Sequence, residues 1–307
     1  MIRALVLATF IAGFFAFTNP KYDAPATYIT VADSVHIEIK TLLDSLGILD
    51  AYSARVFTPV CEVDKCYAIE VYFYWDAIGR FLNYDTIPGS ELTKLDHEPF
   101  THADYRKLNY ILSNPNSVLA QYTKEELVRD VRASDVDGMT GATIHEIKET
   151  VIEGAVYSCY TLWHIAHGEA KDSILKATRS SLDRSLVRKL VHQQDQEINY
   201  FLIDNFSKED FAGYLPEILK AIEDGVGYFA KNAIEKLPAD ALQDNLSQRF
   251  FASNFSQLDY FAQVALLKRL GGVSLSQELK DALKVQLDDR NSHKNELIRQ
   301  VLMSDDL

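Results

Sequence analysis

The chain has 307 residues, and its 31 basic and 44 acidic residues give a net charge of −13. Apolar residues make up 47 % and charged residues 24 %, which excludes a largely disordered chain, a collagen and a protein with many membrane spans. No stretch is dense in Lys and Arg, so we expect no nucleic-acid partner. Three cysteines are too few for a disulfide scaffold and lack the spacing of a four-ligand zinc site.

Residues 1–18 have the pattern of an export signal. Arg3 precedes an apolar run over residues 4–17, and a polar turn at residues 19–21 comes after it. The run is shorter than the ~20 residues that span a bilayer. We therefore predict a signal peptide, with a short retained anchor in the inner membrane or a buried helix as the alternatives. A signal or an anchor places the folded chain in the periplasm or another extracytoplasmic compartment, where disulfides persist.

The next part of the chain has two kinds of periodicity. Residues 31–50 have apolar residues at helical spacing, so we predict a helix there. Residues 55–87 change to strand spacing, because every second residue from Tyr67 to Trp75 is apolar. A tight turn at residues 76–79 precedes another predicted strand, from Phe81 to Ile87. We predict a meander of three antiparallel strands.

Residues 100–168 return to helix. Two N-cap pairs predict helix starts within residues 100–132: Thr101 with Asp104, and Thr123 with Glu126. The polar residues 114–117 predict a turn between these two helices. A single amphipathic helix is predicted from Ile144 to His167, with Gly168 ending it.

Residues 172–307 show no strand pattern and predict a series of short helices. Three segments open alike: Tyr200-Phe201-Leu202, Tyr228-Phe229-Ala230 and Tyr260-Phe261-Ala262. They are 28 and 32 residues apart, a period typical of paired helices in HEAT or armadillo solenoids. An irregular helical bundle with coincidental aromatics is the alternative.

One loop carries the candidate chemistry. It reads Asp137-Gly138-Met139-Thr140-Gly141-Ala142-Thr143 and lies just before the predicted long helix. Free backbone N–H groups and the helix dipole favour a phosphate or another anion at such a place. Taken alone the pattern is weak, since most glycine-containing loops before helices are plain turns.

The sequence pattern Asp-x-x-Thr-Gly-Ala-Thr in this loop resembles the attachment motif of the FMN-binding domain family. That family includes the periplasmic flavin subunits of sodium-pumping NADH:quinone reductase and of the Rnf electron-transfer complex. The resemblance implies that a flavin transferase joins FMN to Thr143 through a phosphoester. The remaining residues implied to bind the cofactor lie in the same loop: Asp137, Gly138, Thr140, Gly141 and Ala142.

The resemblance covers about residues 50–168 and implies a β-meander before the motif and a helix after it. Residues 55–60 and 84–87 depart from the family's glycine-rich approach and its Gly-His-x-Glu-Thr segment. Tyr72, Tyr74 and Trp75 are candidates for stacking on the isoalloxazine, with plain core packing as the alternative. The expected fold is an α+β flavin-binding domain with an antiparallel sheet (30–170), followed by an all-α HEAT-like domain (172–307).

The cysteines and two histidines are assigned structural roles. Cys61 and Cys66 lie across a four-residue turn between strands, so we predict a disulfide, with a redox-active pair as the alternative. Cys159 lies on an apolar stripe and is predicted to be an inert core thiol. His164 and His167 have no third ligand nearby, so we expect no metal there and a role at the negative end of a helix dipole.

These expectations combine into an exported electron carrier that passes electrons to or from a redox partner protein and uses a helical domain for docking. The main alternative is a non-redox binding scaffold with a flavin-free, degenerate FMN-binding domain. A flavin reductase with its own small substrate ranks last, because no acid–base pair in the sequence supports it.

Overall fold

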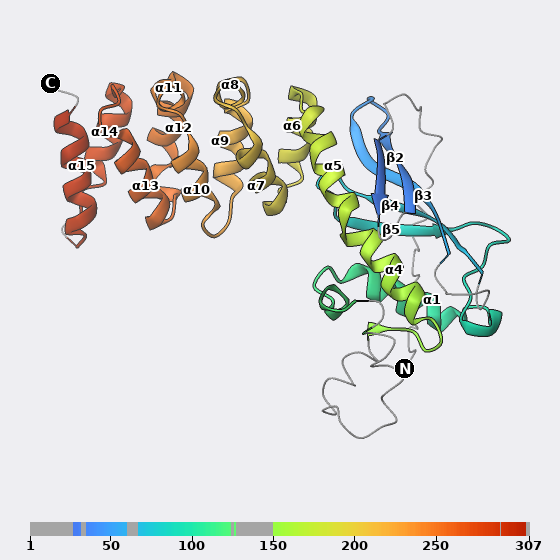
Figure 1. Ribbon diagram of the computed structural model, residues 1–307. Helices are drawn as coiled ribbons and strands as arrows, with labels where there is room; N and C mark the ends of the chain where they lie inside the picture. The colour runs from blue at the N-terminus through green and yellow to red at the C-terminus, as the bar shows by residue number, and fades with distance from the viewer. Residues whose placement is uncertain are drawn as a thin grey trace, which may run out of the picture. The chain divides into compact units, whose positions relative to one another are not determined.

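The computed structural model describes residues 27–31, 35–59, 67–123, 126, 150–288 and 290–304 (Figure 1). The chain forms two compact units, with the boundary between Ala170 and Lys171. The predicted export signal and the predicted disulfide of Cys61 and Cys66 lie outside the described residues. Within the described part of the chain, no helix has the length and apolar character needed to cross a bilayer.

The first unit is built on a five-stranded antiparallel sheet whose strands are arranged in chain order. The strands are β1 (Thr27–Val31), β2 (Val35–Leu43), β3 (Leu49–Thr58), β4 (Ile69–Trp75) and β5 (Phe81–Thr86). The predicted three-strand meander is confirmed as β3, β4 and β5. The expected antiparallel sheet is therefore present, with two further strands at its start.

Alternation along β4 produces the core face of this sheet. Val71, Phe73 and Trp75 are completely buried, while Tyr72 between them is 40 % exposed. Their partners on β3 are also buried, since Val71 pairs with Val56 and Phe73 with Ala54. One face of the sheet is thus apolar and the other faces solvent, as the two-residue period requires.

The turn from β4 to β5 is the predicted one at residues 76–79. Gly79 adopts a φ of +75°, which a side chain would disfavour. A carboxylate oxygen of Asp76 accepts hydrogen bonds from the backbone N–H of Ile78 at 3.0 Å and of Arg80 at 2.9 Å. The side chain of Asp76 therefore holds its own turn closed.

The predicted helix over residues 31–50 is wrong. The structure places β2, a turn and the start of β3 there. The apolar residues of β2 also fit a two-residue period, because Ile37 and Ile39 are buried and alternate with polar residues. Leu42 is buried although it falls outside this alternation, and Leu43 comes directly after it, so with Val31, Val35 and Ile39 they imitate helical spacing.

Helices pack with the sheet in the first unit. Helix α1 (His102–Ser113) packs against β5 and against α4 (Val156–His167), and α4 also packs against the 3₁₀ helix η2 (Val118–Gln121). Another 3₁₀ turn, η1 (Leu95–His97), precedes α1. The predicted N-cap pair of Thr101 and Asp104 is confirmed as a capping box at the start of α1.

The prediction of one helix from Ile144 to His167 is wrong. Residues 151–155 form a non-helical turn, and α4 begins only at Val156. Gly154 has a φ of +75°, and its carbonyl oxygen accepts a hydrogen bond from the N–H of Leu95 at 2.8 Å. A tertiary hydrogen bond and a left-handed glycine therefore replace helical geometry at this point. The predicted end at Gly168 is confirmed, since a Cβ there would overlap the carbonyl oxygen of His164.

The second unit is entirely helical over the residues that the structure describes. Helix α5 (Glu169–Ser180) spans the boundary between the units. The helices after it are α6 (Arg184–His192), α7 (Gln196–Asn205), α8 (Lys208–Gly213), α9 (Leu215–Asp224), α10 (Phe229–Lys236), α11 (Ala239–Gln243), α12 (Asn245–Asn254), α13 (Tyr260–Leu270), α14 (Gln277–Val285) and α15 (Ser292–Ser304). A short 3₁₀ turn, η3 (Phe255–Gln257), comes directly after α12.

These helices stack in two rows (Figure 1). In one row α6 packs on α9, α9 on α12 and α12 on α14, and in the other α7 packs on α10, α10 on α13 and α13 on α15. The short α8 and α11 precede α9 and α12 and contact each other. Each helix of a row therefore contacts the helix at the corresponding place in the next pair.

Hydrogen bonds connect neighbouring helix pairs in the row of α7, α10 and α13 at a regular spacing. Asn232 donates to the hydroxyl of Tyr200 at 3.1 Å, 32 residues away in the chain. Lys236 pairs with Asp204, and Arg269 donates to the carbonyl oxygen of Leu237, at the same separation of 32 residues. One set of side-chain bonds thus connects α7 to α10 and the next connects α10 to α13.

The three Tyr-Phe openings fall only partly in this register. Tyr228 is the N-cap of α10 and Tyr260 is the first residue of α13, so these two are equivalent. Tyr200 lies well inside α7, which begins at Gln196. The first of the three segments is therefore about one helical turn out of register with the other two.

Candidate functional site

The loop predicted to bind the cofactor is not part of the described structure. All of its candidate residues fall in the undescribed stretch between Glu126 and Thr150: Asp137, Gly138, Thr140, Gly141, Ala142 and Thr143. The residues on either side of this stretch are described, so the structure defines both of its ends.

The chain enters this stretch through a helix start. Thr123 donates hydrogen bonds to a carboxylate oxygen of Glu126 from its backbone N–H at 3.0 Å and from its hydroxyl at 2.9 Å. The N–H of Glu126 donates back to the hydroxyl oxygen of Thr123 at 3.2 Å. The predicted N-cap pair is confirmed, and it satisfies two backbone N–H groups that a helix start leaves without partners.

The chain leaves it through the turn at residues 151–155. This turn separates Thr150 from α4, so α4 is not a continuation of the helix predicted to begin directly after the candidate loop. Val151, Ala155 and Cys159 are nevertheless all buried, as the apolar stripe predicts. The apolar spacing therefore predicted these buried positions correctly. It wrongly predicted helix over residues 151–155.

The three residues predicted as stacking candidates, Tyr72, Tyr74 and Trp75, do not lie on the same face of β4. Trp75 is completely buried, and its indole N–H donates to the carbonyl oxygen of Ala166 at 2.8 Å, so core packing is confirmed for it. Tyr72 and Tyr74 lie on the opposite face of β4, with Tyr72 paired to Arg55 and Tyr74 to Ser53. The structure therefore does not bring the three rings together.

Charged groups surround Tyr72 on the solvent face of the sheet. Arg55 forms an ion pair with Glu70 on the neighbouring strand. A carboxylate oxygen of Glu70 also accepts a hydrogen bond from the hydroxyl of Ser90 at 3.1 Å. Phe57 on the same face is 61 % exposed, so this face presents an aromatic and a charged side chain next to each other.

His164 and His167 lie in the last turn of α4 and contact backbone carbonyls. Nε2 of His164 lies 3.2 Å from the carbonyl oxygen of Leu119, and Nε2 of His167 lies 2.7 Å from that of Leu112. A carbonyl oxygen can only accept, so each Nε2 carries the hydrogen. Among the described residues no group of three or more His, Cys, Asp or Glu could hold a metal ion.

The charge state of His164 does not suit the role expected for it. Burial lowers the pKa of His164 below its ordinary value of 6.5, against a smaller opposite effect of its hydrogen bond to Leu119. The ring is therefore neutral at pH 7, and the expected interaction of a charged imidazolium with the helix dipole is wrong for His164. The neutral ring of His164 instead forms a hydrogen bond between α4 and η2.

Cys159 is the buried core thiol that the sequence predicts. Its side chain is completely buried, and its sulfur accepts a hydrogen bond from the N–H of Ile152 at 3.3 Å. Burial raises the pKa of the thiol to about 12. Since the thiolate is the reactive form, this cysteine is unreactive in the folded protein.

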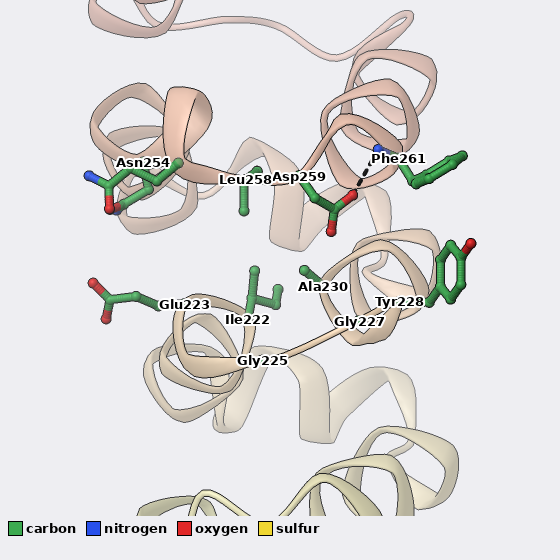
Figure 2. Close-up of a pocket in the computed structure, with 11 residues that line it drawn as sticks. Ile222, Glu223, Gly225, Gly227, Tyr228, Ala230, Asn254, Leu258, Asp259 and Phe261 are labelled. Carbon is green, nitrogen blue, oxygen red and sulfur yellow. Dashed lines mark hydrogen bonds between the residues drawn. The ribbon is translucent and has the colours of Figure 1, made fainter.

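Each unit of the described structure contains a cavity. In the first unit a cavity of about 480 Å³ lies beside Tyr67 and His97, whose ring centroids are 4.2 Å apart. In the second unit a cavity of about 420 Å³ lies between the α9–α10 and α12–α13 loops (Figure 2). Sequence reasoning missed this second cavity, although the equivalent residues Tyr228 and Tyr260 belong to the Tyr-Phe pairs beside it.

No protein-family model matches this chain, and neither a curated protein nor a solved structure matches it.

Proposed function

We propose that this chain is an exported electron-transfer protein that carries FMN attached through a phosphoester to Thr143. The observation that carries the proposal is the motif Asp137-Gly138-Met139-Thr140-Gly141-Ala142-Thr143, in which all five positions that define the flavin attachment motif match. A match of five specified residues in a chain of this length arises by chance only about once in a thousand, given average composition.

The residue types in the loop suit a bound phosphoester. Thr143 ends in a hydroxyl, which is the group that such an ester requires. Gly138 and Gly141 have no side chains, so backbone N–H groups can approach a phosphate closely. Asp137 would hold the loop or bind the metal of the flavin transferase. Bound FMN would supply the redox chemistry, while the protein binds and orients it.

The order of elements in the first unit supports the same function. The antiparallel meander of β3, β4 and β5 precedes the motif, and the helix α4 comes after it. This is the arrangement that the resemblance to the FMN-binding domain family implies. An electron carrier also needs no acid–base pair of its own, so we favour this role over that of a substrate-specific oxidoreductase.

We assign the second unit to partner docking, as a HEAT-like solenoid. Its two rows of stacked helices and the 32-residue spacing of three hydrogen bonds in the row of α7, α10 and α13 support this. The partners would be a flavin transferase during maturation and a redox protein afterwards. The alternative is a flavin-free binding scaffold, which the exposed aromatic residues of the second unit also suit.

A denaturing gel imaged for flavin fluorescence tests the proposal. The chain is co-expressed with a flavin transferase and exported, and a fluorescent band is expected for the wild type. Thr143→Ala should abolish this band, because it removes the hydroxyl. Thr86→Ala, at an exposed position on β5, is the matched control and should keep it. A dark wild-type band, or a fluorescent Thr143→Ala band, would overturn the proposal and favour the scaffold.

A further inference from the structure

The cavity of the second unit lies between two successive helix pairs (Figure 2). Ile222 comes from α9, Ala230 from α10 and Leu258 from the loop before α13. Leu258 and Ala230 are at most 9 % exposed, and Ile222 is almost completely buried. These three side chains give the cavity an apolar lining.

Two aromatic rings lie at one end of this cavity. The rings of Tyr228 and Phe261 have their centroids 5.4 Å apart, and both side chains are more than half exposed. Figure 2 shows the two side chains on the same side of the cavity. Tyr260 and Val226 are exposed nearby in the sequence. Exposed aromatics gathered at a cavity are typical of an interaction site.

The charge of the cavity lining is negative. Asp259 and Glu223 line it, and among the described residues no Lys or Arg does. One carboxylate oxygen of Asp259 accepts hydrogen bonds from the N–H groups of Phe261 at 2.8 Å and Ala262 at 2.9 Å, which fix its orientation. Glu223 is paired with Lys220 at 3.1 Å, but the same lysine also pairs with Asp224, so a negative excess remains.

We propose that this cavity binds an arginine side chain from an exposed segment of a partner protein. The alkyl part of arginine would contact Ile222, Ala230 and Leu258, as such stems do on apolar surfaces. Its guanidinium would pair with Asp259 and lie against Tyr228 or Phe261. The inference rests on the docking role proposed above for the second unit and names the chemistry of the partner.

The test uses the full chain and a fluorescein-labelled hexa-arginine peptide as the probe. Fluorescence anisotropy measures the dissociation constant of the peptide. The buffer contains about 0.15 M salt, which screens the long-range attraction between the cationic peptide and the acidic protein. Asp259→Asn removes the charge but keeps a side chain that caps a helix equally well. Asp244→Asn is the matched control, because Asp244 caps α12 in the same way and does not line the cavity.

We expect Asp259→Asn to weaken peptide binding about fivefold or more, and Tyr228→Ala and Phe261→Ala about threefold each. Asp244→Asn should change it by less than about twofold. Equal weakening by Asp259→Asn and Asp244→Asn, or wild-type binding that does not saturate, would overturn the proposal. The Thr143→Ala chain should bind the peptide like the wild type, so a failure of the flavin proposal is distinguishable from a failure of this one.

Discussion

The indole N–H of Trp75 donates a hydrogen bond to the backbone carbonyl oxygen of Ala166 at 2.8 Å. Ala166 lies in the last turn of α4, where helical geometry leaves carbonyl oxygens without an intrahelical donor. Both residues are completely buried. One side chain of the sheet therefore satisfies a backbone group that the end of α4 would otherwise leave unpaired.

Replacing Trp75 by Phe should lower the free energy of unfolding by about 1–3 kcal/mol. Phenylalanine keeps an aromatic ring in the core but has no N–H, so the carbonyl of Ala166 loses its donor. Urea denaturation followed by circular dichroism measures the change. Tyr72→Phe, at a 40 % exposed position on the same strand, is the control and should change stability by less than about 0.5 kcal/mol. Equal stability of both variants would show that the Trp75 bond contributes nothing.

His164 should make the protein less stable at mildly acidic pH. Burial lowers its pKa in the folded state below 6.5, so the unfolded chain takes up a proton first as the pH falls. The stability that the neutral His164 contributes is fully present above pH 6.5. It declines as the pH falls below 6.5, until the pH reaches the pKa of His164 in the folded state. We expect the free energy of unfolding to fall as the pH drops below 6.5, and His164→Gln to reduce this fall.

Thermal melts at a series of pH values measure the effect. His293→Gln, at an exposed position on α15, should keep the wild-type pH dependence. If His164→Gln and the wild type lose the same stability on acidification, His164 is not the group responsible.

Titration of thiols should distinguish the three cysteines. The chain has three, and Cys159 is buried with a pKa raised to about 12. If Cys61 and Cys66 are bonded to each other, as we predict for exported protein, native protein should react with no thiol reagent. Denatured, unreduced protein should then show one thiol, and reduced protein all three. Three thiols in the unreduced denatured chain would contradict the disulfide.

The second unit should fold without the first. Its helices pack on one another in two rows, and the buried side chain of Gln248 bonds within the unit, donating to the carbonyl oxygen of Ser274 at 2.7 Å. A fragment of residues 171–307 should be soluble, with a helical circular dichroism spectrum and a cooperative melt. A featureless spectrum would show that this unit depends on the first.

The sequence predicted best where local pattern and tertiary packing agree. β4 alternates without a break, and the side chain of Asp76 closes its own turn, so both were predicted correctly. The capping pairs of Thr101 and Thr123 are likewise local. The predicted helix over residues 31–50 failed, because Leu42 breaks the alternation of β2, and the pairing with β3 that makes this segment a strand is not visible in the segment alone.

Other features depended on contacts that the sequence does not display. The turn at Gly154 is held by Leu95, far away in the chain, so the helical spacing around it was misleading. The cavity beside Tyr228 and Phe261 exists only because α10 and α13 stack at a spacing of about 32 residues. The flavin motif, in contrast, can be recognised in the sequence but lies outside the described residues. Flavin attachment therefore stays a prediction.

The most direct test of the flavin proposal is the mass of the exported wild-type chain, purified after co-expression with a flavin transferase. Intact-protein mass spectrometry should show the mass of one FMN less one water added to the polypeptide. Fragmentation should place that addition on Thr143. An unmodified mass for the exported chain, or an addition on another residue, would contradict the account.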